Sequence, residues 1–550
     1  MSQPVSPYRN WYHPYTPDRK YARRAAYFSM EFGIDQGLKI YSGGLGFLAG
    51  SHLKSAFDLK QNMIGIGMLW KYGYYDQERQ QDGTMASRLV EKRYDYLQDT
   101  GIELSVAIND NPDVRVRVWV LPPDVFQTVP LYLLSTDVPD NDHLSRTITD
   151  RLYDPNDETR ISQSIVLGIG GAKLVGLLGG ADCYHLNEGH ALPAFYYLRD
   201  QGVPSSQMVF TTHTPEKGGN ETRNGYHLNN RGFFGRRLPD PELRRELVGE
   251  ELNYTVSALR HSKKANAVSK LHARVARQMW QPFGLDSRIV PITNAQHPGY
   301  WTDPALQKHF EKNQVKAFRK RKTQMKADLF REVMNQTGKR FDPEVLTVVW
   351  ARRFAAYKRA DLLLRDFERF RKLLTNPEKP IQIIWAGKPY PEDYGAINIF
   401  NRLIEVSWGF PNLSVLTGYE MELSRLLKEG SDIWLNTPRI TREASGTSGM
   451  TAAMNGSLNL TVNDGWIPEF ARHGENAFVL PEADPGQPHS VQDEVDSKNL
   501  YEILEKDVLP LYYEQPEKWM EMVFRAKEEV VPAFSSHRMA DAYYRELYKA

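Results

Sequence analysis

The sequence predicts an α/β fold with parallel sheets, organised in two halves. Short apolar runs of β-forming residues alternate with longer helical patterns along the chain, which is typical of α/β proteins. Several of these runs are apolar at consecutive positions and bounded by turn residues, as in strands buried on both faces. The length of 550 residues favours two or more domains over one.

Each half contributes four predicted strands, with helical patterns between them. In the first half they are residues 63–69, 114–120, 183–186 and 208–212, and in the second half residues 345–350, 381–386, 433–435 and 458–462. A charged segment, residues 308–339, has apolar residues at roughly helical spacing and predicts an exposed amphipathic helix near the junction of the halves. Acidic residues interrupt its basic run, so a solvated face is favoured over a nucleic-acid or membrane helix.

The composition excludes several classes of protein. Hydrophobic residues make up 41% and charged residues 25% of the chain, as in soluble proteins with a sizeable core. The 69 basic and 68 acidic residues leave a net charge of +1, which argues against nucleic acid or an anionic membrane as the main partner. The single cysteine, Cys183, forms no intrachain disulfide, and no secretory signal or membrane span is visible. We therefore expect a cytoplasmic protein.

Residues that follow predicted strands are the first candidates for function, because ligands of open α/β sheets bind beyond the carboxyl ends of the strands. Arg353 and Lys358 follow the strand at 345–350 and combine a fixed guanidinium fork with a mobile point charge, which suits a phosphate. A solvated turn explains them equally well. Residues 443–450 form a small-residue loop before a helical pattern, which is either a helix-terminus anion site or a plain capped helix.

A second glycine loop, containing Gly43 and Gly44, precedes another helical run and lacks the P-loop pattern. The two loops and the basic strand end indicate an anion held between two domains. Asn187, Glu188 and His213 also follow predicted strands and suit the recognition of sugar hydroxyls, although core or capping roles stay open for each. The histidines lack the spacing of a metal site, so we expect no metal.

From Tyr27 to Trp466 the chain resembles the α-glucan phosphorylases that act on glycogen, starch and maltodextrin, especially their compact bacterial branch. The matching motifs are residues 27–33 (YFSMEFG), 42–46 (SGGLG), 185–191 (HLNEGHA), 210–215 (FTTHTP), 266–272 (NAVSKLH), 353–359 (RFAAYKR) and 443–450 (EASGTSGM). The resemblance implies a GT-B fold, in which two Rossmann-like domains face each other across a cleft. It places the acceptor or glucan side in residues 1–300, the donor or phosphate side in 301–525, and a C-terminal helix that packs back on the first domain in 526–550.

The resemblance also implies a hexosyltransferase that moves a glucosyl unit, with retention, between an α-1,4-glucan or oligosaccharide and phosphate. Carried over by motif, the family's roles fall on one set of residues. Arg353 and Lys358 would bind the substrate phosphate together with a backbone N–H of the Gly43–Gly44 loop. Glu443 and Ser445 would contact the glucosyl hydroxyls, and the His213 carbonyl would lie near the anomeric carbon. The backbone of Gly446, Thr447 and Ser448 would bind the phosphate of the family's cofactor. The family contains many homodimers, so the resemblance allows a homodimer here.

One position departs from the family at its cofactor. The family's motif ends Gly-Met-Lys, and that lysine carries pyridoxal phosphate as a Schiff base, whereas this chain reads Gly449-Met450-Thr451. Threonine has no amine, so we expect no covalent cofactor and at most non-covalent pyridoxal phosphate. Thr451 also has a purely structural interpretation, because a threonine early in a helix can cap or pack.

Three functions remain open at this stage. The chain is a phosphorylase with non-covalent pyridoxal phosphate, a glycosyltransferase that uses a nucleotide-sugar donor without that cofactor, or a catalytically silent glucan-binding or regulatory protein. Retention of Arg353, Lys358 and Glu443 favours an enzyme. A transferase acting on α-glucan and phosphate or a phosphorylated donor is our expectation.

Overall fold

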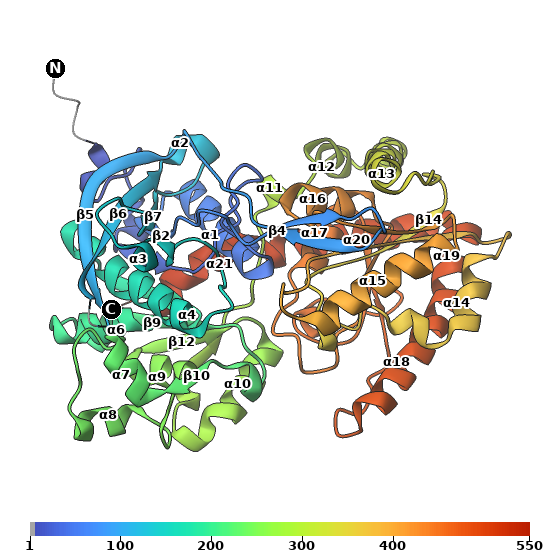
Figure 1. The fold of residues 1–550 in the computed structure, drawn as a ribbon. Coiled ribbons are helices and arrows are strands. Elements are labelled where there is room, and N and C mark those ends of the chain that lie inside the picture. Colours follow the sequence, from blue (N-terminus) through green and yellow to red (C-terminus); the bar gives the residue numbers. More distant parts are fainter. Residues whose placement is uncertain (1–5, 110, 550) are drawn as a thin grey trace. The chain divides into compact units, whose positions relative to one another are not determined.

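The computed structural model describes residues 6–109 and 111–549, which form two compact units. Unit 1 contains the chain up to Tyr75, Leu89–Thr293 and the segment from Ser536 onward, and unit 2 contains Asp76–Arg88 and Asn294–Ser535. The hairpin Asp76–Arg88 thus belongs to unit 2, although it lies within the first 300 residues. Figure 1 colours the chain along the sequence.

The core of unit 1 is a sheet of nine strands in the order β13-β12-β9-β8-β1-β2-β7-β6-β5 among the described residues. Seven of them pair in parallel: β1 (Ala25–Phe28), β2 (Met63–Met68), β7 (Leu131–Ser135), β8 (Cys183–Asn187), β9 (Met208–Thr212), β12 (Lys264–Ala267) and β13 (Ile289–Pro291). The predicted strands at 63–69, 183–186 and 208–212 are confirmed as β2, β8 and β9.

Two long strands extend this sheet at one edge with antiparallel pairing. β6 (Asn111–Leu121) pairs antiparallel with β7 and with β5 (Gln98–Ile108). The strand predicted at 114–120 is therefore confirmed as β6, but the expectation of an entirely parallel sheet is wrong at this edge. Inward and outward residues alternate along β5, as expected for a strand with one solvated face.

The strand order of unit 1 reverses between β1 and β8. The chain starts in the middle of the sheet, builds β2 and β7 on one side, and then returns to build β8, β9, β12 and β13 on the other. This is the doubly wound order, and its ligand crevice lies beyond the carboxyl ends of the two central strands.

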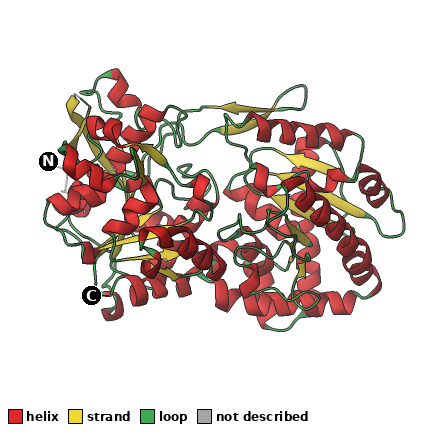
Figure 2. Cartoon of the chain, turned by 90° about the horizontal axis from the view of Figure 1, so that it is seen from below, coloured by secondary structure: helices red, strands yellow, loops and turns green. Residues whose placement is uncertain are grey.

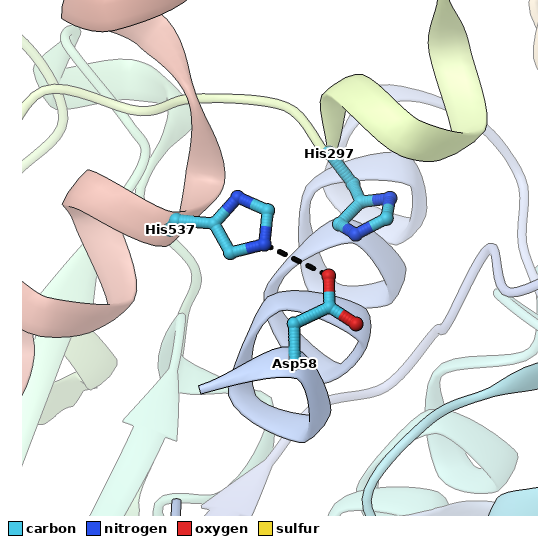
Figure 3. Close-up of side chains that lie close together, drawn as sticks. All are labelled: Asp58, His297 and His537. Atoms are coloured by element: carbon cyan, nitrogen blue, oxygen red, sulfur yellow. Dashed lines mark hydrogen bonds and ion pairs between the residues drawn. The ribbon is translucent and has the colours of Figure 1, made fainter. Parts of the chain in front are cut away.

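Short helices and two further strands complete unit 1. They are α1 (Gly44–Asp58), α2 (Pro123–Phe126), α3 (His143–Thr147), α4 (Asp157–Ile165), α5 (Gly171–Leu177), α6 (Pro193–Asp200), α7 (Gly225–Arg231), α8 (Asp240–Glu246), α9 (Tyr254–His261), α10 (Lys270–Trp280) and α21 (Ser536–Ala542), with the strands β10 (Thr222–Asn224) and β11 (Glu251–Asn253). The C-terminal helix α21 packs on α1, where His537 Nε2 lies 2.8 Å from Asp58 Oδ2 (Figure 3).

The core of unit 2 is a six-stranded sheet in the order β16-β15-β14-β17-β18-β19 among the described residues. The strands are β14 (Leu346–Ala351), β15 (Ile381–Ala386), β16 (Leu413–Leu416), β17 (Ile433–Asn436), β18 (Leu458–Thr461) and β19 (Phe478–Val479), and every pair is parallel. The four strands predicted in this half are confirmed as β14, β15, β17 and β18. Numbered along the chain, the order is 3-2-1-4-5-6, the order of Rossmann sheets, with the switch point between β14 and β17.

Helices lie on both faces of this sheet, as Figure 2 shows in red against the yellow strands. They are α11 (Pro298–Trp301), α12 (Pro304–Glu311), α13 (Val315–Thr337), α14 (Phe367–Leu374), α15 (Tyr394–Trp408), α16 (Met421–Gly430), α17 (Ser448–Met454), α18 (His489–Ile503), α19 (Leu509–Glu514) and α20 (Pro516–Phe534). The hairpin of β3 (Asp76–Arg79) and β4 (Met85–Arg88) also belongs to unit 2.

The charged segment at 308–339 differs from the single exposed helix expected from its sequence. It forms the end of α12 and then α13, with a break at residues 312–314. Two lysines of α13 are buried: Lys322 Nζ donates to the carbonyl of Asn455 at 2.8 Å, and Lys326 Nζ pairs with Asp432 at 2.6 Å. Charge alone did not reveal that these side chains tie α13 to the sheet. Within the described residues, no helix has the length and apolar character needed to cross a bilayer.

Candidate functional site

The switch point of unit 2 gathers the residues that the sequence placed after two separate strands. The segment from Arg352 to Arg359 follows β14, and the loop that leads to Glu443 follows β17, the strand next to β14. Both segments leave the carboxyl ends of parallel strands, so they meet at one edge of the sheet.

Glu443 is the centre of this cluster. Lys358 Nζ donates to its Oε2 at 2.7 Å, and Arg352 Nη1 lies 3.1 Å from the same oxygen. Burial alone would raise the pKa of Glu443, but the charges of Lys358 and Arg352, with a smaller contribution from Arg353, outweigh it and lower the pKa to about 2. Glu443 is therefore ionised at neutral pH.

Arg352 and Arg353 point in different directions although they are adjacent. Arg352 is buried, whereas Arg353 is exposed at the end of β14. The sequence predicts a phosphate contact for Arg353 and no role for Arg352. The alternation of side chains at the end of a strand was the available signal, because it directs two neighbours to opposite sides.

Asp464 fixes the backbone of Glu443 from a third strand end. It follows β18, and its Oδ2 accepts the backbone N–H of Glu443 at 2.8 Å while Oδ1 accepts that of Gly465 at 2.8 Å. Asp464 is 2% exposed, and this burial raises its pKa to about 7. Sequence reasoning missed this residue, although the strand-end rule that selected Glu188 applies equally to it.

The loop after Glu443 supplies small polar groups. The Ser445 hydroxyl is buried and has no hydrogen-bond partner in the part of the chain that the structure describes. Gly446 has φ +84°, and a Cβ at this position would lie 3.2 Å from Glu443 Cγ, so the loop requires glycine there. Thr447 precedes α17 without a side-chain capping bond, and Ser448 Oγ accepts instead from Trp434 Nε1 at 3.2 Å. Of the two interpretations of this loop, the plain capped helix is therefore contradicted at the Thr447 side chain.

Thr451 is fully buried within α17. Its Oγ1 donates to the carbonyl of Ser448 at 3.0 Å, one turn back in the same helix. Two buried lysines, Lys322 and Lys527, donate to the carbonyls of Asn455 and Met454, respectively. Position 451 therefore has a hydroxyl that bonds within its own helix, and the two lysine amines bond to backbone carbonyls at the end of α17.

The switch point of unit 1 brings together Asn187, His213 and Ser29. Asn187 ends β8, and its Nδ2 donates to Ser29 Oγ, just after β1, at 3.1 Å. His213 Nε2 lies 2.7 Å from Asn187 Oδ1, so Nε2 carries the proton. Burial lowers the pKa of His213 to about 3, which keeps its imidazole neutral at working pH.

Glu31 holds the glycine loop of unit 1. Its carboxylate accepts the backbone N–H of Ser42 at 2.6 Å, the N–H of Gly43 at 3.2 Å and the hydroxyl of Tyr153 at 2.8 Å. Burial raises the pKa of Glu31 above its ordinary value, although the hydrogen bonds from these donors act to lower it. The Gly43 N–H is thus engaged by Glu31, whereas Gly44 begins α1 and a Cβ on it would meet open space.

Glu188 holds the backbone of His213. It has φ +70°, and its Oε2 accepts the N–H of His213 at 2.7 Å and the hydroxyl of Thr214 at 3.3 Å. Burial raises the pKa of Glu188 to about 7. The sequence suggested a sugar contact for this residue, and the structure shows these internal contacts.

Comparison with known proteins places the chain. The carbohydrate phosphorylase family matches residues 304–480. The maltodextrin phosphorylase of Thermococcus litoralis is 34% identical, over 99% of this chain and 72% of that protein. The chain belongs to the carbohydrate phosphorylase family. A glycogen phosphorylase of Aquifex aeolicus is 30% identical over 96% of this chain and 86% of its own length, and an uncharacterized protein of Methanocaldococcus jannaschii is 45% identical over 95% and 99%.

Membership of the carbohydrate phosphorylase family confirms the resemblance drawn from the motifs. The matched segment contains the whole cluster around Glu443, including Lys358, Asp464 and position 451. The family match therefore covers the segment of unit 2 in which charged residues follow the strands.

Proposed function

We propose that the chain is a retaining α-glucosyl transferase of the carbohydrate phosphorylase family. It would transfer a glucosyl unit between an α-1,4-glucan or oligosaccharide and phosphate or a phosphorylated donor. The observation that carries the proposal is the buried Glu443–Lys358–Arg352 cluster at a Rossmann switch point. Relatives named as maltodextrin and glycogen phosphorylases support it. The proposal includes the GT-B fold class, and the switch point in the sheet of each unit supports it.

The charge of the unit 2 cluster suits a phosphoryl group. Lys358 and Arg352 share one carboxylate oxygen, so the pair retains a net positive charge after Glu443 is counted. Arg353 adds a second positive charge at the exposed end of β14. Preorganised cations of this kind stabilise the charge on a transferring or attacking phosphate at little reorganisation cost.

The same cluster offers groups for sugar hydroxyls. Glu443 is ionised, and both cations contact Oε2, which leaves Oε1 as the acceptor that we assign to a glucosyl hydroxyl. The buried Ser445 hydroxyl is the second group that we assign to the sugar. In unit 1, neutral His213 would present its backbone carbonyl toward the anomeric carbon, and Glu188 fixes that backbone.

A nucleotide-sugar donor is the second candidate, and Thr451 is the observation that favours it. The family cofactor has no lysine here to bind covalently, so phosphorolysis would need non-covalent pyridoxal phosphate or none. A donor that brings its own phosphates does not need that cofactor.

The test begins with the purified full-length chain. Acid-released pyridoxal phosphate is measured first, and then maltodextrin phosphorolysis with phosphate, glucosyl transfer from glucose 1-phosphate, and transfer from a panel of nucleotide sugars. We expect turnover with phosphate or glucose 1-phosphate and no covalently bound cofactor. Turnover with nucleotide sugars only would mean that the glucosyl donor is a nucleotide sugar and not glucose 1-phosphate. No turnover with any donor, in protein that still binds maltodextrin, would overturn the proposal in favour of a silent glucan-binding protein.

A further inference from the structure

Arg359 is a buried charge on a strained backbone, directly after Lys358. Its side chain is only 2% exposed, and arginines are rarely buried to this degree unless their N–H groups are paired. Its backbone has φ +50°, in the left-handed region that residues other than glycine seldom adopt. Such a conformation persists only where the surrounding contacts hold it in place. The contacts of Arg359 therefore show what the residue is there to hold.

The guanidinium of Arg359 reaches from its own segment to the loop that leads to Glu443. Nε donates to the carbonyl of Thr437 at 2.8 Å, and Nη2 donates to the carbonyl of Pro438 at 2.8 Å. Both carbonyls lie just beyond the end of β17. One planar side chain thus joins the segment that carries Lys358 to the loop that carries Glu443.

Thr437 makes the same connection in the opposite direction. Its Oγ1 lies 3.1 Å from the carbonyl oxygen of Lys358 and 3.2 Å from that of Arg359, so its single O–H donates to this pair of carbonyls. Trp350 Nε1 donates to the same hydroxyl at 3.1 Å, which fixes its orientation. The two segments are therefore joined by bonds from both sides.

Two carboxylates of α18 hold the guanidinium in place. Arg359 Nη1 donates to Asp493 Oδ1 at 3.1 Å, and Nη2 donates to Asp496 Oδ2 at 2.7 Å. Asp493 also accepts from Arg439 Nη2 at 2.7 Å, and Arg439 belongs to the loop that follows β17. The buried charge of Arg359 is thereby compensated, and charge-assisted bonds from a rigid fork fix its direction.

We propose that Arg359 is a positioning residue for the transfer reaction, because it holds Lys358 and Glu443 in contact. The two side chains meet at 2.7 Å, although each stands on a segment beyond the end of a different strand. A displacement of about 1 Å in a reacting group can lower turnover about a hundredfold. Arg359 itself touches no reacting atom in this scheme. Its role in the reaction rests on the proposed function, whereas its hold on the ion pair does not.

The first test measures the coupling between Lys358 and Glu443 in the absence of any substrate. Urea denaturation of the full-length chain, of Lys358→Met, of Glu443→Gln and of the double variant gives the interaction energy of the pair. The same cycle is then measured in Arg359→Lys, which keeps the charge but replaces the planar fork by a single amine. We expect the coupling to fall to less than half of its original value. An unchanged coupling overturns the proposal.

Arg365→Gln is the matched control. Arg365 Nη2 pairs with Asp493, a carboxylate that Arg359 also contacts, at 2.7 Å, but the Arg365 side chain is 44% exposed. We expect Arg365→Gln to keep both the coupling and the turnover of the wild type. A loss as large as that in Arg359→Lys would show that the charge around Asp493 controls the pair, and would overturn the assignment to the bonds between Arg359 and the loop.

Thr437→Val repeats the cycle with a smaller change, in case Arg359→Lys does not fold. This variant keeps the shape of the side chain and removes the hydroxyl that donates to the carbonyls of Lys358 and Arg359. We expect the coupling between Lys358 and Glu443 to fall here as well. Full coupling in Thr437→Val, where Arg359→Lys does not fold, overturns the proposal.

Turnover separates positioning from a merely structural role. At a temperature where both proteins are fully folded, we expect kcat of Arg359→Lys to be at least about tenfold below that of the wild type, with a smaller change in KM for maltodextrin. An unchanged kcat in folded Arg359→Lys overturns the positioning role and leaves the transferase intact. Reduced coupling, in a chain that transfers glucose from no donor, supports the hold of Arg359 on the pair and counts against the proposed function.

Discussion

Lys358 Nζ and Glu443 Oε2 form a buried hydrogen-bonded ion pair at 2.7 Å, which Arg352 joins at the same oxygen. Glu443→Gln would leave two buried cations without their carboxylate. Because removing one partner of a buried pair leaves an uncompensated charge, we expect the free energy of unfolding to fall by about 3 kcal/mol. Urea denaturation measures the loss.

The control for this prediction is another carboxylate of unit 2. Glu505 pairs with Arg369 at 2.6 Å, but both side chains are partly exposed. Glu505→Gln should cost less than about 1 kcal/mol, because solvent screens exposed pairs. Equal losses in the two variants would show that burial does not set the strength of the Glu443 cluster.

Arg353→Ala should reduce turnover by about two orders of magnitude or more, because it removes a cation that we assign to the phosphate. Arg353 is exposed, so thermal unfolding should stay close to that of the wild type. Arg371→Ala, on the exposed face of α14, is the matched control and should retain full activity. Unchanged activity of Arg353→Ala would remove this residue from the phosphate site.

The sequence predicted the central strands of unit 2 to within one or two residues because they are buried on both faces. Such strands are apolar at consecutive positions, and turn residues bound them, as residues 381–386 illustrate. The strand-end rule then selected Lys358 and the family motif selected Glu443, and the structure places these two residues in contact although 85 positions separate them.

Other features depend on tertiary contacts that no local pattern encodes. The antiparallel pairing of β5 with β6 depends on which edge of the sheet is open, and the burial of Lys322 depends on carbonyls of two distant segments. Asp464 stands after a strand as Glu188 does, but its backbone contact to Glu443 comes only from the adjacency of β17 and β18.

Asp464 should make the stability of the chain pH-dependent. Its pKa is about 7 in the folded chain, against an ordinary value of 3.8, so between these values only the folded state holds the proton. Its contribution is therefore present at acidic pH and lost as the pH rises toward 7. The stability of the wild type relative to Asp464→Asn should fall by on the order of 2 kcal/mol between about pH 5 and about pH 8.

Denaturant melts of the wild type and of Asp464→Asn across this pH range measure the difference between their free energies of unfolding. Buried histidines such as His213 have an opposing effect on stability, but both proteins share it, so it cancels in the difference. Asp484→Asn, in an exposed loop, is the control and should show no such trend. A constant difference between the wild type and Asp464→Asn would mean that Asp464 is ionised in the folded chain.

Restoring the family's lysine should destabilise this chain. Thr451 is 0% exposed and its hydroxyl bonds within α17, so Thr451→Lys must fit a longer side chain that ends in an amine into a packed position. We expect a loss of about 1–3 kcal/mol from overpacking, measured by denaturation. Thr451→Ser, which keeps the hydroxyl, should lose less. A fully stable Thr451→Lys would instead reveal space for a lysine beside α17.

Glu31 should control the affinity for phosphate through the glycine loop. Its carboxylate accepts the N–H groups of Ser42 and Gly43, so Glu31→Gln would turn an amide N–H₂ toward donors and release the start of α1. If the Gly43–Gly44 loop binds phosphate, as the family resemblance implies, KM for phosphate should rise at least about tenfold while KM for maltodextrin changes less. Tyr153→Phe removes a single donor to Glu31 and should cost only about 1 kcal/mol of stability, with a smaller change in KM. Parallel changes in both KM values would indicate general loosening of unit 1, because a loop that positions phosphate affects the two substrates differently.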